Sequence, residues 1–309
     1  MTKIPVGKTI AHAYRFTFQN FVPIICVMWP AWVLMAVIMF FMRGDFVALT
    51  QASATRNFTL LQGHLGRLLL SYLVIFVLLF MQITGLTRLS LGLPMPSRHY
   101  YFSLGKPVWR LIGAVLLTVL AIAAVVAVYA LAIFVLGLVA AVFLHGQTAG
   151  AAKAIVALLT VLALLIAYCG MIFMVARFFF LLAPIVVAEE SINIGRAWLL
   201  TNRNFWRIFL IILSIVIPFG VIEVAGLMAL AGPMPLLPQG NSPDQLLAFQ
   251  QAQRAWQLSY MSRMFDYWYL VFPAGALLSV LIYGVSCAAQ AFAYRQLTLG
   301  EALTPVALH

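Results

Sequence analysis

Six long apolar runs constrain this chain more than any other feature of its sequence. Each run holds about 20 or more residues with at most one charge, the length of helix that crosses a hydrocarbon core about 30 Å thick. With 65% hydrophobic and only 8% charged residues, the chain cannot cover a water-soluble surface. We therefore predict an all-α integral membrane protein with about six transmembrane helices. The predicted spans are Phe21–Met42, Leu68–Leu86, Leu111–Leu144, Ala154–Leu182, Ile208–Leu230 and Tyr267–Ala293.

The third and fourth runs are longer than the hydrocarbon core, so we expect these helices to tilt or to project from the membrane. The first run is too long for the apolar part of a signal peptide, which indicates a retained span. The third run also carries several small residues, which let helix backbones approach closely. We therefore predict that the third span lies inside the bundle. The small residues are Ala114, Ala121, Ala123, Ala127, Ala130 and Gly137.

Basic residues between the runs orient the chain. The formal net charge is +11, from 18 Lys and Arg against 7 Asp and Glu. With the N-terminus inside, twelve of the 18 basic residues lie in inner segments and six in outer segments, which predicts cytoplasmic N- and C-termini. These cations would face anionic headgroups, and the chain has no basic domain that could bind nucleic acid. We therefore expect membrane lipids as partners, and no nucleic acid.

Two loops on the outer side are long enough to hold structure of their own. We predict that residues 43–66 form a polar loop that contains a short helix. In the second loop, Ser242 followed by Pro243 is typical of a helix start, with Ser at the N-cap and Pro at the first helical position. Apolar residues at helical spacing then predict an amphipathic helix on the outer surface. Two interpretations remain open, a structural cover of the bundle and a cap over a cavity.

The sequence contains an internal repeat. The segments 13–21 (AYRFTFQNF) and 197–205 (AWLLTNRNF) share Ala, an aromatic residue, Thr, Asn and Phe at one fixed offset. A weaker third copy surrounds Trp109 and Arg110. We therefore predict one polytopic domain, residues 1–309, with units at about 5–95, 96–188 and 189–300. Each unit is expected to be an interfacial helix followed by a transmembrane hairpin, in a three-fold repeat about the membrane normal.

The segment that opens each unit combines cations with apolar and aromatic side chains at helical spacing. Such a helix lies in the membrane plane, with its apolar face at the acyl boundary and its cations among the headgroups. Each Lys or Arg near an anionic surface contributes about 1 kcal/mol of attraction. The predicted anchors are Lys8, Arg15, Trp109, Arg110, Trp198 and Trp206.

Two stretches carry a resemblance to a known family. Residues 177–209 read RFFFLLAPIVVAEESINIGRAWLLTNRNFWRIF, and residues 7–21 read GKTIAHAYRFTFQNF. Both resemble the glycerophosphoryl diester phosphodiesterase membrane domain and the related YciC-like bacterial inner-membrane proteins. The resemblance implies a multi-pass protein of the bacterial inner membrane concerned with envelope or lipid physiology. Some relatives carry a soluble phosphodiesterase domain, but this chain has no room for one, so that activity is not implied.

Charged residues gather where the fourth run ends and the fifth begins. Glu189 and Glu190 precede Ser191, where a helix is expected to begin, so their charge suits the helix dipole. Arg177 lies deep in the fourth run, within reach of a carboxylate or, by snorkelling, of headgroups. Two interpretations remain open, ion pairs that tie the hairpin to the interfacial helix and a site for a headgroup or another anionic substrate. The members are Arg177, Glu189, Glu190, Arg196, Arg203 and Arg207.

Glu223 is a second candidate, because it is an ionisable residue inside the fifth run. Burying a carboxylate in hydrocarbon costs several kcal/mol unless the group is paired or protonated, so such a residue indicates a function. One interpretation gives it a proton-coupled or substrate-binding role. The other places it near the outer interface, where it reaches headgroups or Arg254.

The sequence shows no catalytic motif. The five histidines are scattered, and no metalloprotease, P-loop or nucleophile-elbow motif occurs. We therefore expect no catalytic residues, no cofactor and no metal. The expected function is that of a non-enzymatic inner-membrane protein of envelope and lipid homeostasis, which binds or moves lipid or another amphiphile. The alternative is an accessory or assembly subunit with a protein partner in a larger membrane complex.

Overall fold

The computed structural model describes residues 3–55, 57, 59, 62–96, 100–143, 150–233, 235–236 and 242–302. Within these residues the chain forms helices and no strand. Six of the helices are long and apolar enough to cross a membrane, judged by length and composition. The prediction of an all-α fold with six candidate spans is therefore confirmed.

The six long helices begin and end near the predicted residues. Each apolar run is helical because a backbone in hydrocarbon must satisfy its hydrogen bonds internally. They are α2 (Phe21–Phe41), α4 (Leu65–Ser90), α5 (Lys106–Phe143), α6 (Gly150–Phe179), α9 (Phe205–Ala231) and α11 (Trp268–Ala302). The shorter helices are α1 (Val6–Gln19), α3 (Arg43–Thr55), α7 (Leu182–Ala188), α8 (Ile194–Thr201) and α10 (Pro243–Asp266).

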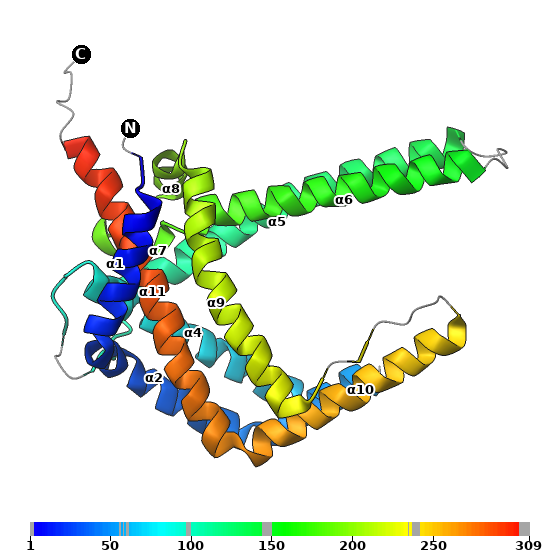
Figure 1. Cartoon of the computed structure of the whole chain (residues 1–309), viewed down its shortest axis with the longest axis horizontal. Helices are drawn as coiled ribbons and strands as arrows, with labels where there is room; N and C mark the ends of the chain where they lie inside the picture. The colour runs from blue at the N-terminus through cyan, green and yellow to red at the C-terminus, as the bar shows by residue number, and fades with distance from the viewer. Residues whose placement is uncertain are drawn as a thin grey trace.

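Helix α1 packs along α11, so the start of α1 and the end of α11 belong to one end of the molecule (Figure 1). We call this the terminal end, and the end that carries α3 and α10 the opposite end. The contact between α1 and α11 is close because Gly284 has no side chain. A Cβ atom built at Gly284 would lie 2.8 Å from Thr17 Cγ2.

Two apolar clusters form the core toward the terminal end. One joins α1, α7, α8, α9 and α11, and includes the fully buried Ile185, Ile208 and Ile211. The other joins α2, α4, α5, α7 and α11, and includes the fully buried Met28 and Met81. Helix α7 contributes to both clusters, which explains why the fourth apolar run continues inward past the end of α6.

The hairpin of α5 and α6 projects away from the other helices, and we call it the arm (Figure 1). Near the terminal end, α5 packs on α4 and α7, and α6 packs on α8 and α9. Farther out the two helices contact each other, as where the Tyr129 hydroxyl donates to the Ala163 carbonyl at 2.8 Å. Ala123, Ala127 and Ala130 are exposed. The prediction that the third span lies inside the bundle is therefore wrong, because small side chains suit lipid contact as well as helix contact.

The two aligned segments adopt matching structures. Helix α2 begins at Phe21 and α9 begins at the aligned Phe205. Thr17 and Thr201 are both buried. Each donates its hydroxyl to the carbonyl four residues earlier, at 2.9 Å and 2.8 Å. The first and third units therefore enter their spans in the same way.

The middle unit differs from the other two. Described residues 100–105 form no helix ahead of α5, so a separate interfacial helix is absent from that stretch. Trp109 and Arg110 lie within α5 itself. The three-fold repeat over units 5–95, 96–188 and 189–300 therefore stays a prediction.

Helices α3 and α10 pack together at the opposite end. Ser242 caps α10 as predicted, since its hydroxyl accepts a hydrogen bond from the Gln245 N–H at 3.3 Å. None of the side chains of α10 is buried. The Trp256 indole donates to the Gly232 carbonyl and Arg263 donates to the Leu230 carbonyl, each at 3.1 Å. These two bonds fasten α10 to the end of α9.

Candidate functional site

Charged residues at the terminal end are joined to one another. Glu189 Oε1 accepts hydrogen bonds from Arg196 Nε at 3.3 Å and from the Tyr294 hydroxyl at 3.0 Å. Glu190 Oε2 accepts from Arg110 Nη1 at 3.3 Å. These contacts join the end of α7 to α5, α8 and α11. Exposed ion pairs contribute about 1 kcal/mol or less, so they fix the positions of the helices more than they stabilise the fold.

Arg177 is buried, with 7% of its surface exposed. It donates from Nη2 to the Trp198 carbonyl at 2.9 Å and from Nε to Thr201 Oγ1 at 3.3 Å. Its guanidinium lies 3.5 Å from the centre of the Trp198 ring and 5.4 Å from that of Phe173. A cation over an aromatic face is attracted by the ring quadrupole. Arg177 therefore binds α8 and is shielded by Trp198.

Arg207 and Asn204 hold the N-terminal segment. Arg207 Nη1 donates to the Ile4 carbonyl at 2.9 Å, and the Ile4 N–H donates to Asn204 Oδ1 at 3.2 Å. Ile4 is itself fully buried. Five of the six clustered residues thus contact other protein groups, which favours the interpretation as structural pairs over that of an anion site.

The remaining member, Arg203, is exposed, as are the predicted anchors Lys8 and Arg15. None of these three cations makes a hydrogen bond or an ion pair with a residue that the structure describes. Trp109 and Trp206 are 55% and 72% exposed. Exposed Trp beside free cations is typical of a headgroup boundary.

Glu223 lies in α9, within a candidate span, and its side chain is exposed. It makes no hydrogen bond or ion pair with any described residue, so the interpretation that pairs it with Arg254 is not supported. Helix α9 continues to Ala231, about 12 Å farther at 1.5 Å per residue. A carboxylate at this depth needs a partner from outside the described chain, a proton or water.

Three polar side chains of α11 lie on one helical face, because Tyr283, Ser286 and Gln290 follow a spacing of three and four residues. They are partly exposed, although residues 287–289 between them are buried. None of the three makes a hydrogen bond with a described residue. Tyr283 lies near enough to Glu223 for an electrostatic interaction. We call Glu223, Tyr283, Ser286 and Gln290 the polar stripe.

A pocket of about 180 Å³ opens beside Ser286 and Gln290. Glu223 lies seven residues after Val216, a wall residue, and therefore on nearly the same face of α9. Helix α6 runs outward along the arm and α9 runs toward the opposite end, so the two helices diverge (Figure 1). The remaining walls are Val175, Phe179 and Phe180 from the end of α6, and Ile212 and Ile215 of α9.

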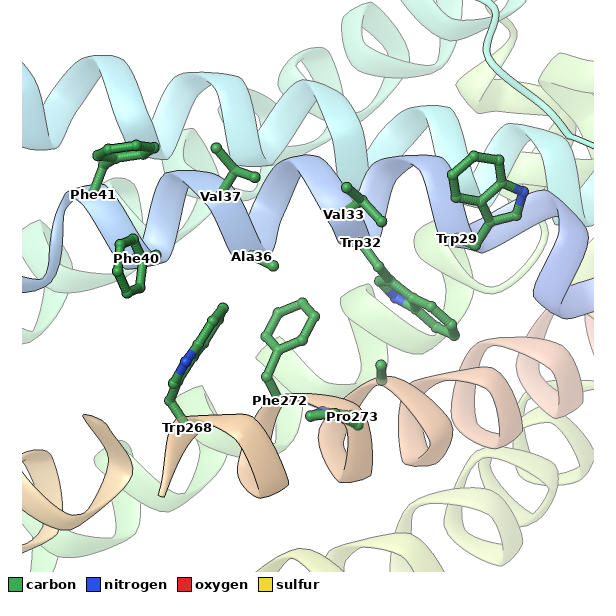
Figure 2. A pocket seen from close by; sticks show the side chains of 11 residues that line it. Trp29, Trp32, Val33, Ala36, Val37, Phe40, Phe41, Trp268, Phe272 and Pro273 are labelled. Carbon is green, nitrogen blue, oxygen red and sulfur yellow. The ribbon is translucent and has the colours of Figure 1, made fainter. Parts of the chain in front are cut away.

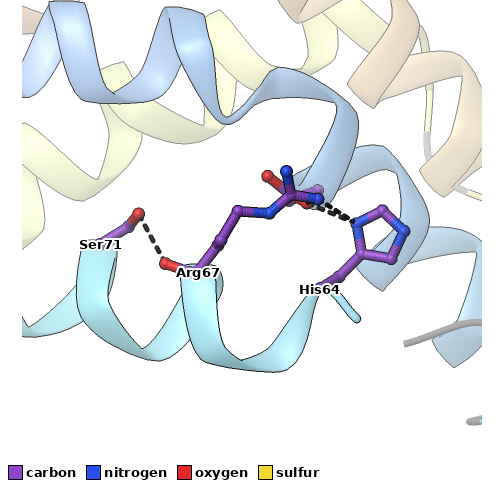
Figure 3. Close-up of polar contacts among 4 residues, drawn as sticks. His64, Arg67 and Ser71 are labelled. Carbon is purple, nitrogen blue, oxygen red and sulfur yellow. Dashed lines mark hydrogen bonds and ion pairs between the residues drawn. The ribbon is translucent and has the colours of Figure 1, made fainter. Parts of the chain in front are cut away.

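Sequence reasoning missed most of the polar stripe, because it searched the apolar runs for charges. The sequence did contain a signal for the stripe: Tyr283, Ser286 and Gln290 are polar residues spaced three and four apart inside the sixth run. It also missed a contact at the opposite end, where the buried Asp45 binds Arg67 at 2.9 Å and His64 (Figure 3). This contact joins the start of α3 to the start of α4.

Two groups of α1 have shifted pKa values. The His12 ring lies 4.5 Å from the Phe292 ring, centre to centre. Partial burial lowers the pKa of His12 from its usual 6.5, and the nearby Arg295 and Arg15 lower it further. Burial raises the pKa of Tyr14, whose hydroxyl donates to the Ser214 carbonyl at 3.3 Å. Both groups are therefore neutral at neutral pH.

Among the residues that the structure describes, no three His, Cys, Asp or Glu side chains gather in a way that could hold a metal ion. No family model, curated protein or solved structure matches the chain. The resemblance to the glycerophosphoryl diester phosphodiesterase membrane domain and YciC-like proteins therefore stays a prediction.

Proposed function

We propose that the protein is a non-enzymatic, multi-pass membrane protein that binds, and moves, an amphiphile whose polar head lies against the polar stripe. The observation that carries this proposal is a set of polar side chains that make no hydrogen bond or ion pair with a described residue: Glu223, Tyr283, Ser286 and Gln290. Unsatisfied polar groups at membrane depth are costly, so a ligand head, water or a proton must complete them.

The chemistry of the stripe favours a head that carries an amine. Glu223 supplies the only carboxylate of the stripe, and Gln290, about 10 Å along α11 from Tyr283, supplies a separate carbonyl acceptor for another polar atom of the head. An ammonium group offers three hydrogen-bond donors and the opposite charge. The exposed wall of the arm would accept the acyl chains, since its described side chains beyond the terminal end are almost all apolar.

The remaining parts of the proposal rest on the sequence. The basic bias supports cytoplasmic termini, and the family resemblance supports a bacterial inner membrane and a role in envelope or lipid homeostasis. Lys8, Arg15 and Arg203 would then bind anionic headgroups on the cytoplasmic side, as three cations without protein partners in the described chain.

Native mass spectrometry of the purified protein tests this proposal. Dioleoylphosphatidylethanolamine is added to the wild-type protein, to Glu223→Gln and to Gln290→Leu. We expect each variant to bind it about fivefold more weakly, the effect of losing one charged or polar contact. Asp244→Asn is the matched control, because Asp244 is an exposed carboxylate on α10, outside the stripe. Equal binding by wild type and both variants would sink the proposal.

A flipping assay tests movement separately from binding. In vesicles that contain a fluorescent phosphatidylethanolamine, the wild-type protein is expected to speed its exchange between leaflets, and Glu223→Gln is expected to slow that exchange. Exchange no faster than in empty vesicles restricts the function to binding.

A second candidate function is that of an accessory subunit, and the arm favours it. Beyond the terminal end, most described side chains of α5 and α6 are exposed and the hairpin projects away from the other helices (Figure 1), so this surface is available to another membrane protein. Native mass spectrometry of the protein, extracted gently from its own membrane, distinguishes the two functions. A stoichiometric polypeptide in place of a fixed lipid mass identifies the accessory role.

A further inference from the structure

A long apolar groove lies between α2 and α11, toward the opposite end (Figure 2). It encloses about 510 Å³, within the size range of small-molecule sites. Aliphatic and aromatic side chains form its walls, among them Ala36 and Phe40 of α2 and Trp268 and Ala276 of α11. The walls carry no polar group like those of the polar stripe. The part of a ligand that contacts these walls must therefore be apolar.

The groove exists because α2 and α11 are in contact at both of its ends. Toward the terminal end, a Cβ atom at Gly284 would lie 3.1 Å from Ile24 Cδ1. At the opposite end the rings of Phe40 and Trp268 are 5.6 Å apart. Pro30 lies inside α2 and Pro273 inside α11, and each removes a backbone hydrogen bond, which permits bending.

The dimensions of the groove match one acyl chain. Its wall on α2 runs from Trp29 to Phe41, about 18 Å at 1.5 Å per residue. One leaflet accounts for about half of a hydrocarbon core about 30 Å thick. Val33 and Val37 are 52% and 46% exposed, so the groove is open along its side to the bilayer. An acyl chain of the leaflet at the opposite end would lie along it from the side.

A cation that makes no hydrogen bond or ion pair with a described residue marks the mouth of the groove at the opposite end. Arg43 is exposed, lies just past the end of α2 and makes no hydrogen bond or ion pair with a described residue. Its guanidinium lies 5.3 Å from the centre of the Phe40 ring, which closes that end of the groove. The carboxylate nearest in sequence, Asp45, is bound by Arg67 and His64 instead. The Arg43 donors are therefore available to a phosphate at headgroup depth.

We propose that this groove binds one acyl chain of an anionic phospholipid from the leaflet at the opposite end, with its phosphate held by Arg43. The site is distinct from the polar stripe in place and in chemistry. The groove binds a lipid with an anionic headgroup, whereas the polar stripe binds a headgroup that carries an amine. The two proposals can therefore be tested separately.

Native mass spectrometry with two lipids of equal chains tests the site. Dioleoylphosphatidylglycerol and dioleoylphosphatidylcholine are each added to the purified full-length protein in detergent. Arg43→Gln is expected to bind the phosphatidylglycerol about fivefold more weakly. The loss for the phosphatidylcholine is expected to be smaller, because the choline cation of that headgroup offsets the charge of its phosphate. The double variant Ala36→Leu with Ala276→Leu fills the groove and is expected to weaken the binding of both lipids.

Ala252→Leu is the matched control, because Ala252 is an exposed alanine on α10, outside the groove, the polar stripe and the arm. It is expected to bind both lipids as the wild-type protein does. Two results would overturn the proposal. One is phosphatidylglycerol binding that is unchanged both in Arg43→Gln and in the double variant that fills the groove. The other is equal binding of the two lipids by the wild-type protein. Glu223→Gln is expected to leave the phosphatidylglycerol result unchanged, which separates failure here from failure of the proposed function.

Discussion

The junction between α1 and α2 and the junction between α8 and α9 share their sequence pattern but meet different neighbours. Thr17 and Thr201 occupy aligned positions and make the same hydrogen bond back into their own helix. Thr17 packs against the bare backbone of Gly284, whereas Thr201 accepts a hydrogen bond from Arg177. The repeat thus reproduces the turn into the span, while the surroundings decide whether the contact is apolar or polar.

A second aligned pair shows the same difference. Arg196 of α8 pairs with Glu189, but the aligned His12 of α1 faces Arg15 and Arg295. A cation is stabilised at the first position and disfavoured at the second. Substitutions at equivalent positions should therefore give unequal effects, which the following variants measure.

The largest effect is expected for Arg177→Met at the α8–α9 junction. The variant loses the bonds to the Trp198 carbonyl and to Thr201, and the cation over the Trp198 ring. Losing these hydrogen bonds and the cation–π contact together predicts a loss of about 3 kcal/mol in the free energy of unfolding. Thermal unfolding in detergent measures it. Arg203→Met removes an exposed charge nearby, and a similar loss there would contradict the prediction.

The α1–α2 junction is expected to respond most to Gly284→Ala. A Cβ atom at that position lies 2.8 Å from Thr17 Cγ2, so the helices must separate, at a net cost of about 2 kcal/mol. Thermal unfolding again gives the measurement. Gly275→Ala on the same helix meets nothing within 4 Å and is expected to be neutral or stabilising. Thr17→Ser removes the offending methyl group and should restore part of the loss; an additive double variant would speak against the contact.

The parts of the fold that local pattern decides were predictable from the sequence. Apolar length predicted the number and place of the spans, and the aligned segments 13–21 and 197–205 each run directly into a span, as predicted. The arm was not predictable, because alanines at helical spacing suit a lipid-facing helix as well as a buried one. Ala123 is exposed and Ala114 is buried on the same helix, and only the position of α4 and α7 distinguishes them.

The candidate site was predictable only in part, for a related reason. A charge inside an apolar run is conspicuous, so Glu223 and Arg177 could be identified. Their partners depend on tertiary contacts, since Arg177 binds a backbone carbonyl and a hydroxyl that any sequence could supply. The uncharged members of the polar stripe, such as Gln290, become notable only once their neighbours on α11 are seen to be buried.

Gln19 and Arg203 are aligned in the repeat. Glycine substitutions at these two positions are expected to give smaller effects, opposite in sign to each other. Gln19 ends α1 with a helical backbone, but Arg203 has a φ of 63°, a conformation that favours glycine. Arg203→Gly should raise the free energy of unfolding by about 1 kcal/mol, and Gln19→Gly should lower it by up to about 1 kcal/mol. Arg203→Gln, which loses the charge but keeps a side chain, should show no gain. Destabilisation by Arg203→Gly would contradict the assignment of strain.

The smallest effect is expected from protonation of His12. Its pKa in the folded protein lies below 6.5, so the unfolded chain binds the proton more readily, and stability is lost as the pH falls through 6.5 toward the folded pKa. Below that folded pKa the loss is complete. Unfolding temperatures measured from about pH 8 to about pH 5 should therefore fall more for the wild-type protein than for His12→Gln, which cannot titrate in this range. Parallel curves for the two proteins would show that the cations around α1 do not disfavour a charge at this position, and the contrast with Arg196 would lose its electrostatic basis.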